Sequence, residues 1–226
     1  HNVPGRPLGE IGLCNGPSNC ASRGMKISFE GKTSHAAAPE DGISPGSGMG
    51  RLMQDLPLLG SGGAMGQDFS LATLTHAHLG EPSFGVAPGA GELRITLRSQ
   101  TDAHMDQMVS DAETLLRQTL DPQEGLLATV SWHEVFLATV NGSKAVDIAS
   151  GAAERLDLAQ RIMTAPMRWS EDFGRFGLDG AEAAMLFIGS GEDQPQLHNP
   201  NFDFPDALIP VGVSLFVEII DQILSS

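Results

Sequence analysis

Histidine is the residue type in this sequence whose chemistry and placement together indicate a reactive site. A neutral imidazole binds divalent metals such as Zn, Mn or Co. Of the seven histidines, His1, His35 and His198 lie in polar stretches interrupted by glycine and proline. Such stretches predict loops, and loops on a rigid scaffold are where ligands and catalytic groups concentrate. Taken alone, each of the three is explained more simply by a structural hydrogen bond.

The other four histidines favour structural interpretations. His76 and His78 lie two residues apart on one face of a predicted strand. Such a pair can bind metal, but two solvent-facing strand residues are the simpler interpretation. We place His104 in the first turn of a helix and His133 at the end of a strand, both at the surface.

Composition narrows the class of protein. The net charge of -15 repels phosphate backbones and argues against nucleic-acid binding. No run of about 18 apolar residues is long enough to span a membrane, and no signal peptide is visible. Cys14 and Cys20 are not spaced like redox or zinc-binding pairs, so we expect free thiols in a loop. The acidic balance favours a soluble cytoplasmic protein.

The elements that would position these histidines fall into two groups, which together predict an α/β fold. Residues 1–22 predict loop with one short strand. The next segment predicts strand, helix, strand, strand, helix, strand, which is the split βαβ (ferredoxin-like) arrangement of one sheet with both helices on one face. These six elements are expected at 24–31, 45–59, 69–79, 93–97, 103–119 and 126–132, with Thr101 or Asp102 as the N-cap of the second helix.

The remainder of the chain predicts an incomplete domain. A helix at 143–156, a short buried strand at 185–188 and a helix at 207–224 suggest part of an open α/β sheet. One strand is too little sheet to be stable alone. Residues 1–22 and 134–226 are therefore expected to be pieces of a domain whose other strands lie elsewhere.

Four segments carry a family resemblance that covers nearly the whole chain: HNVPGRPLGEIG, GKTSHAAAPEDGISP, RWSEDFGRF and LHNPNFDFPD. In this order they resemble the hippurate hydrolase / N-acyl-amino-acid amidohydrolase (indole-acetyl-amino-acid hydrolase-like) family of dinuclear zinc peptidases. The resemblance implies a lid/dimerisation domain at 23–133. It also implies that 1–22 is a segment of the catalytic domain and that 134–226 is the C-terminal part of that domain.

The same resemblance implies roles for four residues. His1 and His198 correspond to metal ligands of a site that holds two divalent ions (Zn, Mn, Co or Ni) in the full-length family. His35 corresponds to the histidine that polarises the substrate carbonyl in the partner subunit's site. Arg98 corresponds to an arginine that holds the substrate carboxylate, although an exposed strand residue explains it equally well. Ser170 marks the SEDFG segment, and capping of a short helix at Glu171 explains it locally.

The sequence departs from the family in two respects. Gly85 stands where many relatives carry an asparagine that contacts substrate. The Cys-Gly-His-Asp motif and the adjacent glutamates, one of them the general base, are absent from these 226 residues. We therefore expect a fragment that, alone, neither hydrolyses substrate nor binds zinc tightly.

The resemblance implies that the complete enzyme hydrolyses the amide bond of small N-acyl amino acids or dipeptide-like molecules. It also implies a homodimer that forms through the lid. The alternative is a non-catalytic lid-type protein that dimerises or binds a ligand. The absent motifs favour this alternative for the isolated chain, whereas the joint presence of His1, His35 and His198 favours the enzyme.

Overall fold

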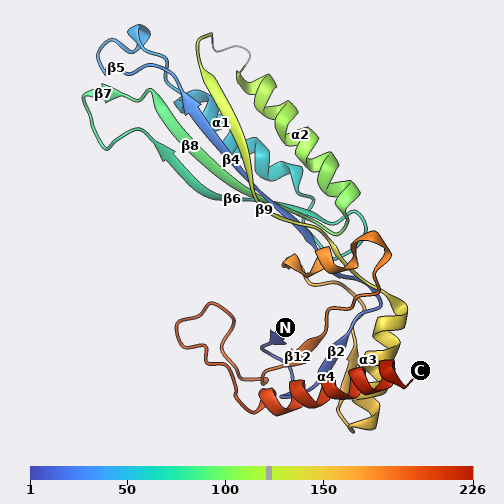
Figure 1. Cartoon of the computed structure of the whole chain (residues 1–226). Coiled ribbons are helices and arrows are strands. Elements are labelled where there is room, and N and C mark those ends of the chain that lie inside the picture. The colour runs from blue at the N-terminus through green and yellow to red at the C-terminus, as the bar shows by residue number, and fades with distance from the viewer. Residues whose placement is uncertain (121–123, 226) are drawn as a thin grey trace. The chain divides into compact units, whose positions relative to one another are not determined.

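The computed structural model describes residues 1–120 and 124–225, which form two compact units (Figure 1). Unit 1 comprises three stretches, namely His1–Asn19, Thr139–Met167 and Asp172–Ser226. Unit 2 comprises Cys20–Ala138 and Arg168–Glu171. None of the helices in the described part of the chain has the length and apolarity needed to cross a bilayer.

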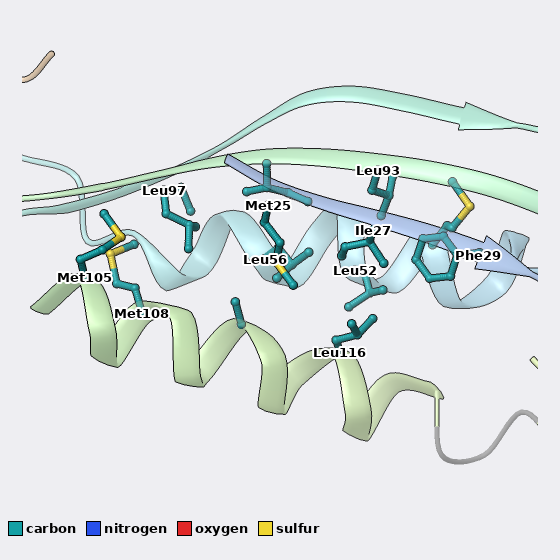
Figure 2. Packing of buried hydrophobic residues seen from close by; sticks show 14 of the residues in the cluster. Met25, Ile27, Phe29, Leu52, Leu56, Leu93, Leu97, Met105, Met108 and Leu116 are labelled. Atoms are coloured by element: carbon teal, nitrogen blue, oxygen red, sulfur yellow. The ribbon is translucent and has the colours of Figure 1, made fainter. Parts of the chain in front are cut away.

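Unit 2 is built on a four-stranded antiparallel sheet with the strand order β6-β8-β4-β9. Its strands are β4 (Ala21–Glu30), β6 (Ser70–Leu79), β8 (Ala90–Ser99) and β9 (Leu127–Phe136). Helices α1 (Gly46–Asp55) and α2 (Asp102–Leu120) cover the same face of the sheet (Figures 1 and 2). The elements follow one another in the predicted order. His133, expected at a strand end, lies inside β9.

The core of unit 2 follows from the spacing of apolar residues along its strands and along its helices. Along β4, the alternating residues Met25, Ile27 and Phe29 point to the helices, because successive strand side chains face opposite sides. Along α2, apolar residues recur every three or four positions and face the sheet. Figure 2 shows the two sets interlocking with Leu52 and Leu56. The predicted helix at 45–59 is α1 followed by the 3-10 turn η2 (Leu56–Leu59), because Pro57 lacks the amide hydrogen that an α-helix needs.

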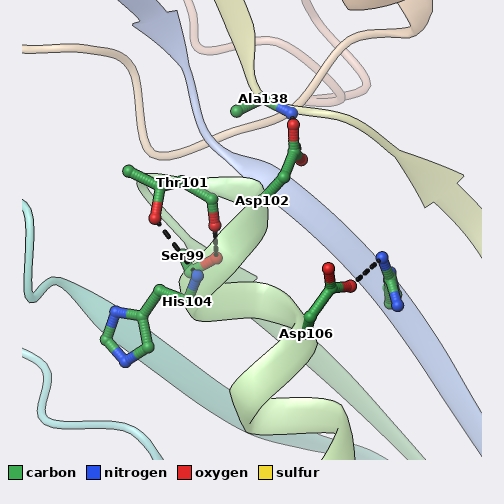
Figure 3. Close-up of polar contacts among 7 residues, drawn as sticks. Ser99, Thr101, Asp102, His104, Asp106 and Ala138 are labelled. Atoms are coloured by element: carbon green, nitrogen blue, oxygen red, sulfur yellow. Dashed lines mark hydrogen bonds and ion pairs between the residues drawn. The ribbon is translucent and has the colours of Figure 1, made fainter.

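Side chains fix the start of α2 (Figure 3). The Oγ1 of Thr101 accepts a hydrogen bond from the His104 amide at 3.2 Å, so Thr101 is the N-cap. Asp102 lies in the first turn, where its charge suits the helix dipole, and its Oδ1 accepts a bond from the Ala138 amide at 2.9 Å. Asp102 thereby ties the start of α2 to the end of the segment that leaves β9.

Unit 1 contains more strands than the sequence suggested. Its mixed sheet has the order β1-β12-β2-β11, and a separate antiparallel pair joins β3 and β10. The expectations of one strand in 1–22 and one in 134–226 are wrong, because strands of two to four residues are too short for alternation to reveal. Their bounds are β1 (Asn2–Val3), β2 (Ile11–Leu13), β3 (Gly16–Asn19), β10 (Thr139–Asn141), β11 (Gln160–Ile162) and β12 (Phe187–Gly189).

A buried asparagine connects three segments of unit 1. The side-chain amide of Asn141 donates to the carbonyl oxygens of Cys14 and Met185 at 2.8 and 3.0 Å. Its oxygen accepts a bond from the Met185 amide at 2.8 Å. Helices α3 (Ser143–Arg155) and α4 (Leu208–Leu224) pack beside the sheet, with α3 and α4 in contact.

Both cysteines are free and buried, as expected for thiols without a disulfide. Cys14 lies between β2 and β3, and Cys20 lies between β3 and β4. Burial raises the pKa of both thiols, that of Cys20 to about 11. Neither is a reactive thiolate at neutral pH.

Candidate functional site

The loop that carries His35 is fixed by backbone contacts at its base. After β4, the backbone groups of Lys32 and Ile43 pair in both directions, at 2.9 and 2.8 Å. A Cβ at Gly31 would collide with the Ile43 carbonyl oxygen, so glycine permits this close approach. The short strand β5 (Ser34–His35) then pairs with β7 (Val86–Ala87) and leads to the 3-10 turn η1 (Pro39–Asp41). His35 is therefore held at the end of unit 2 where β8 begins.

The ring of His35 is set as a hydrogen-bond donor. The Ala37 amide donates to its Nδ1 at 3.0 Å. A neutral imidazole that accepts at Nδ1 carries its hydrogen on Nε2. The side chain is exposed, so Nε2–H points toward solvent or a bound molecule. This form of histidine can donate to a carbonyl oxygen or to a developing oxyanion.

The ring of His1 has the opposite arrangement. Its Nδ1 lies 2.7 Å from the Asn2 carbonyl oxygen, which can only accept, so Nδ1 carries the hydrogen. The Nε2 lone pair is then the group able to bind metal. Metal-binding histidines in proteins commonly donate their other ring nitrogen to a backbone carbonyl in this way. The His1 carbonyl also accepts a bond from the Ile188 amide at 2.9 Å, which ties it to β12.

His198 lies in unit 1, in the loop between β12 and α4, and its side chain is exposed. Its backbone is left-handed, with φ of 69°. A residue other than glycine in this region is uncommon and costs on the order of 1 kcal/mol or more, and such residues cluster at functional sites. The surrounding turn is held by bonds from Asn199 N to Gln196 O at 3.1 Å and from Phe202 N to Asn199 O at 3.0 Å.

The described residues do not form a complete metal site. Within residues 1–120 and 124–225, no three His, Cys, Asp or Glu side chains gather where they could hold an ion. A catalytic zinc typically needs three protein ligands. His1 and His198 fit such a site by their chemistry and belong to one unit, but they do not complete it.

Arg98 is half-buried on β8, so it is not a plainly exposed strand residue. Its Nη1 donates to the Oγ of Ser170 at 3.0 Å and lies 3.4 Å from the Arg168 carbonyl oxygen. Burial lowers the pKa of its guanidinium, which still remains charged at neutral pH. Ser170 thus contacts Arg98, and the 3-10 segment η3 (Asp172–Gly180) begins two residues later.

The link between Arg98 and residues 168–170 escaped sequence reasoning, because about seventy residues separate the partners. The Arg168 guanidinium stacks over the Phe69 ring, 5.1 Å from its centroid, and donates to the Gly63 carbonyl oxygen. An arginine in a strand gives no local signal of such a distant partner. The sequence signal that existed was the RWSEDFGRF segment itself.

The structure separates His35 from Arg98. In the antiparallel register, Ala90 lies opposite Glu30 at the His35 end of the sheet, whereas Arg98 lies opposite Ser22. From Ala90 to Arg98 the strand advances by about 26 Å, at about 3.3 Å per residue. One copy of unit 2 therefore cannot present both side chains to the same small molecule. The other predicted surface histidines lie as expected except His104, which is half-buried.

Comparison with known protein families shows the family to which the chain belongs. A family model described as Peptidase family M20/M25/M40 matches residues 25–222. The chain belongs to this peptidase family. The predicted family relationship is thereby confirmed. Over the whole chain, it is 26% identical to an N-acetyl-L-cysteine deacetylase of Bacillus subtilis (strain 168), of which it covers 53%.

A second relative of this M20-family chain also has a deacetylase name. An N-acetyldiaminopimelate deacetylase of Oenococcus oeni is 21% identical over 94% of the chain, which covers 55% of that protein. The chain spans about half the length of the curated relatives it matches.

Two solved structures share the mixed α/β fold of this M20-family chain. One, from Bacillus subtilis, is described as a dinuclear metal-binding peptidase of the M20 family, with a TM-score of 0.75 and 20% identity. The match includes the whole of this chain and 56% of that structure's chain. The other is an aminobenzoyl-glutamate utilization protein of Klebsiella pneumoniae, with a TM-score of 0.77 and 18% identity, over 97% of this chain and 52% of that one.

Proposed function

We propose that this chain is part of a metal-dependent amidohydrolase that cleaves the amide bond of small N-acyl amino acids or dipeptide-like molecules. Membership of the M20 family supports the reaction class, and the relatives named as deacetylases support the substrate class. The observation that carries the proposal is the opposite hydrogen bonding of two histidine rings. The contact of His1 leaves its Nε2 as an acceptor, which suits a metal ligand, and the contact of His35 leaves its Nε2 as a donor.

Each residue then has a chemical role. His1 and His198 would help to hold divalent metal (Zn, Mn, Co or Ni), with further ligands and the glutamate base in the rest of the protein. Metal bound there would lower the pKa of a water molecule, which supplies the nucleophile. His35 donates from Nε2 to the substrate carbonyl oxygen as negative charge develops on it. Arg98 pairs with the substrate carboxylate, a contact for which a guanidinium fork is well shaped.

We further propose that residues 23–133, which make up most of unit 2, are the lid and dimerisation domain, with 1–22 and 134–226 as parts of the catalytic domain. In a symmetric dimer, His35 of one subunit serves the site of the other. About 26 Å of strand, at about 3.3 Å per residue, separates the His35 end of the sheet from Arg98, which supports a substrate held by His35 and Arg98 of different subunits. The edge strand β6 presents exposed residues from His76 to Leu79, and an open edge can pair with its symmetry mate.

We also propose that the rest of the catalytic domain covers one face of α4. Along this helix an apolar row is more than half exposed: Ile209, Val213, Phe216, Val217, Ile220, Ile223 and Leu224. An apolar cavity of about 400 Å³ lies between α3 and α4, lined in part by Ile148, Leu186 and Ile219. Contiguous apolar surface of this kind usually marks a contact. Relatives nearly twice as long as this chain would have the residues to cover it.

We place the protein in the cytoplasm, as its two unpaired cysteines favour.

The test is expression of the complete gene product that contains these residues. We expect it to hydrolyse hippurate or N-acetylcysteine and to contain divalent metal by elemental analysis. His1→Ala and His198→Ala should each lower the metal content, whereas the exposed His133→Ala is the matched control and should not. A metal-free product without hydrolase activity would refute the proposal and favour a non-catalytic lid-type protein.

A further inference from the structure

The loop opposite His35 carries an unusually exposed aromatic ring. Phe84 lies at the tip of the loop between β6 and β7, and its side chain is fully exposed. Two apolar neighbours, Leu79 and Val86, are also about half exposed. Within unit 2, the apolar core is formed elsewhere, between the sheet and its two helices. Packing of the core therefore does not explain why phenylalanine stands at this position.

Backbone contacts place the loop that carries Phe84 beside His35. The Oγ of Ser83 accepts a bond from the Gly85 amide at 3.2 Å, which closes the turn around Phe84. The Gly85 carbonyl oxygen accepts a bond from the Ala36 amide at 3.0 Å. In the β5–β7 pairing, His35 lies directly opposite Val86, two residues beyond Phe84. The loop and His35 are thus parts of one small structure.

The loop is open beside Gly85. Apart from its chain neighbours Phe84 and Val86, no described residue would lie within 4 Å of a Cβ built at Gly85. Acidic residues lie near this tip, namely Glu81 in the same loop and Glu40 and Asp41 in η1, which contacts β5. These charges repel a carboxylate but leave an uncharged apolar group unaffected.

We propose that Phe84 packs against the acyl group of the substrate and gives the enzyme a preference for large apolar acyl groups over acetyl. The inference rests on the proposed function, in which His35 binds the oxygen of the acyl carbonyl. This carbonyl links the acyl group on one side to the amino acid on the other, and a side chain next to His35 contacts one of these two parts of the substrate. The amino-acid side carries a carboxylate, which the acidic tip disfavours and which Arg98 binds elsewhere. The acyl side is therefore the one that meets the ring.

The test compares two substrates that differ only in the acyl group, hippurate (N-benzoylglycine) and N-acetylglycine, with the complete gene product. Phe84→Ala should lower kcat/KM for hippurate about tenfold or more, because loss of an apolar pocket contact is worth about that much. The value for N-acetylglycine should change by less than about threefold, since acetyl is too small to fill the same contact. Phe84→Leu should restore part of the loss.

Leu58→Ala is the matched control, since Leu58 is an exposed apolar residue on η2 of the same unit. It should change neither value. An equal loss on both substrates, or a Phe84→Ala protein that no longer dimerises by light scattering, would overturn the inference and assign Phe84 to positioning or to an interface. A wild-type protein inactive on both substrates would refute the proposed function itself, and this inference with it.

Discussion

The assignment of His35 to the partner's site leads to a mixing experiment. His35→Ala removes the Nε2 donor from the exposed loop and should lower kcat on the order of 10²–10³-fold, as loss of one oxyanion donor does. The fold should be unaffected. Among residues 1–120 and 124–225, the bond to the ring comes from the Ala37 amide, which lies at the surface where water can replace the ring. Metal content should be unchanged, because the proposed ligands belong to unit 1.

His198→Ala should inactivate the enzyme by a different route, through the metal site. In a mixed dimer of the two variants, one site combines intact metal ligands with an intact His35 from the other subunit. Random reassociation makes half of the dimers mixed, and each mixed dimer has one intact site of two. The mixture should therefore recover about a quarter of the wild-type activity, although each variant alone is nearly inactive.

The assay is hippurate hydrolysis after the two variants are dissociated together, mixed in equal amounts and reassociated. Wild-type protein treated identically is the control for refolding, and His35→Ala mixed with itself gives the background activity. His133→Ala, which alters an exposed histidine on β9 of the same unit, should retain full activity. If the mixture stays inactive while wild-type protein survives the same treatment, His35 does not serve the partner's site. Loss of metal from His35→Ala would also show that its role is wrong.

Four further predictions concern stability, metal binding and assembly. Asn141→Ala should lower the free energy of unfolding by about 3–5 kcal/mol in urea titrations. The substitution leaves the buried backbone groups of Cys14 and Met185 without their hydrogen-bond partner. The control, Asn199→Ala at an exposed position, should lower the free energy of unfolding by less than about 0.5 kcal/mol. The 226-residue chain alone should show no submicromolar zinc binding by calorimetry and no hippurate hydrolysis; turnover with tight zinc binding would reveal a complete site. The complete protein should dimerise through unit 2, so light scattering that shows only monomer at high concentration would contradict that interface. Folding raises the pKa of the Cys20 thiol from 9.0 to about 11, so as pH rises the thiol ionises first in the unfolded chain. The free energy of unfolding should therefore fall as pH rises from about 9 to about 11. In urea titrations over this pH range, Cys20→Ala should show a smaller fall.

Sequence periodicity was sufficient for the long elements. β4 and α2 carry enough repeats for periods of 2 and 3.6 to be recognised, and each lies within a few residues of its expected bounds. Thr101 was recognisable as an N-cap because that signal is local. The short strands of unit 1 were not recognisable. β1 and β12 contain two and three residues, and they pair with each other from opposite ends of the chain, while β12 also pairs with β2.

The residue types of the candidate site, and the family to which they belong, could be recognised from the sequence through its motifs. The tertiary structure decided what each side chain can do. The amide of Ala37 leaves the Nε2 of His35 as a donor, whereas the carbonyl of Asn2 leaves the Nε2 of His1 as an acceptor, and residue type alone does not distinguish the two forms. Likewise, the antiparallel register of β4 and β8 determines that His35 and Arg98 lie at opposite ends of the sheet. These properties depend on which backbone groups and strands become neighbours on folding, and that is a non-local outcome.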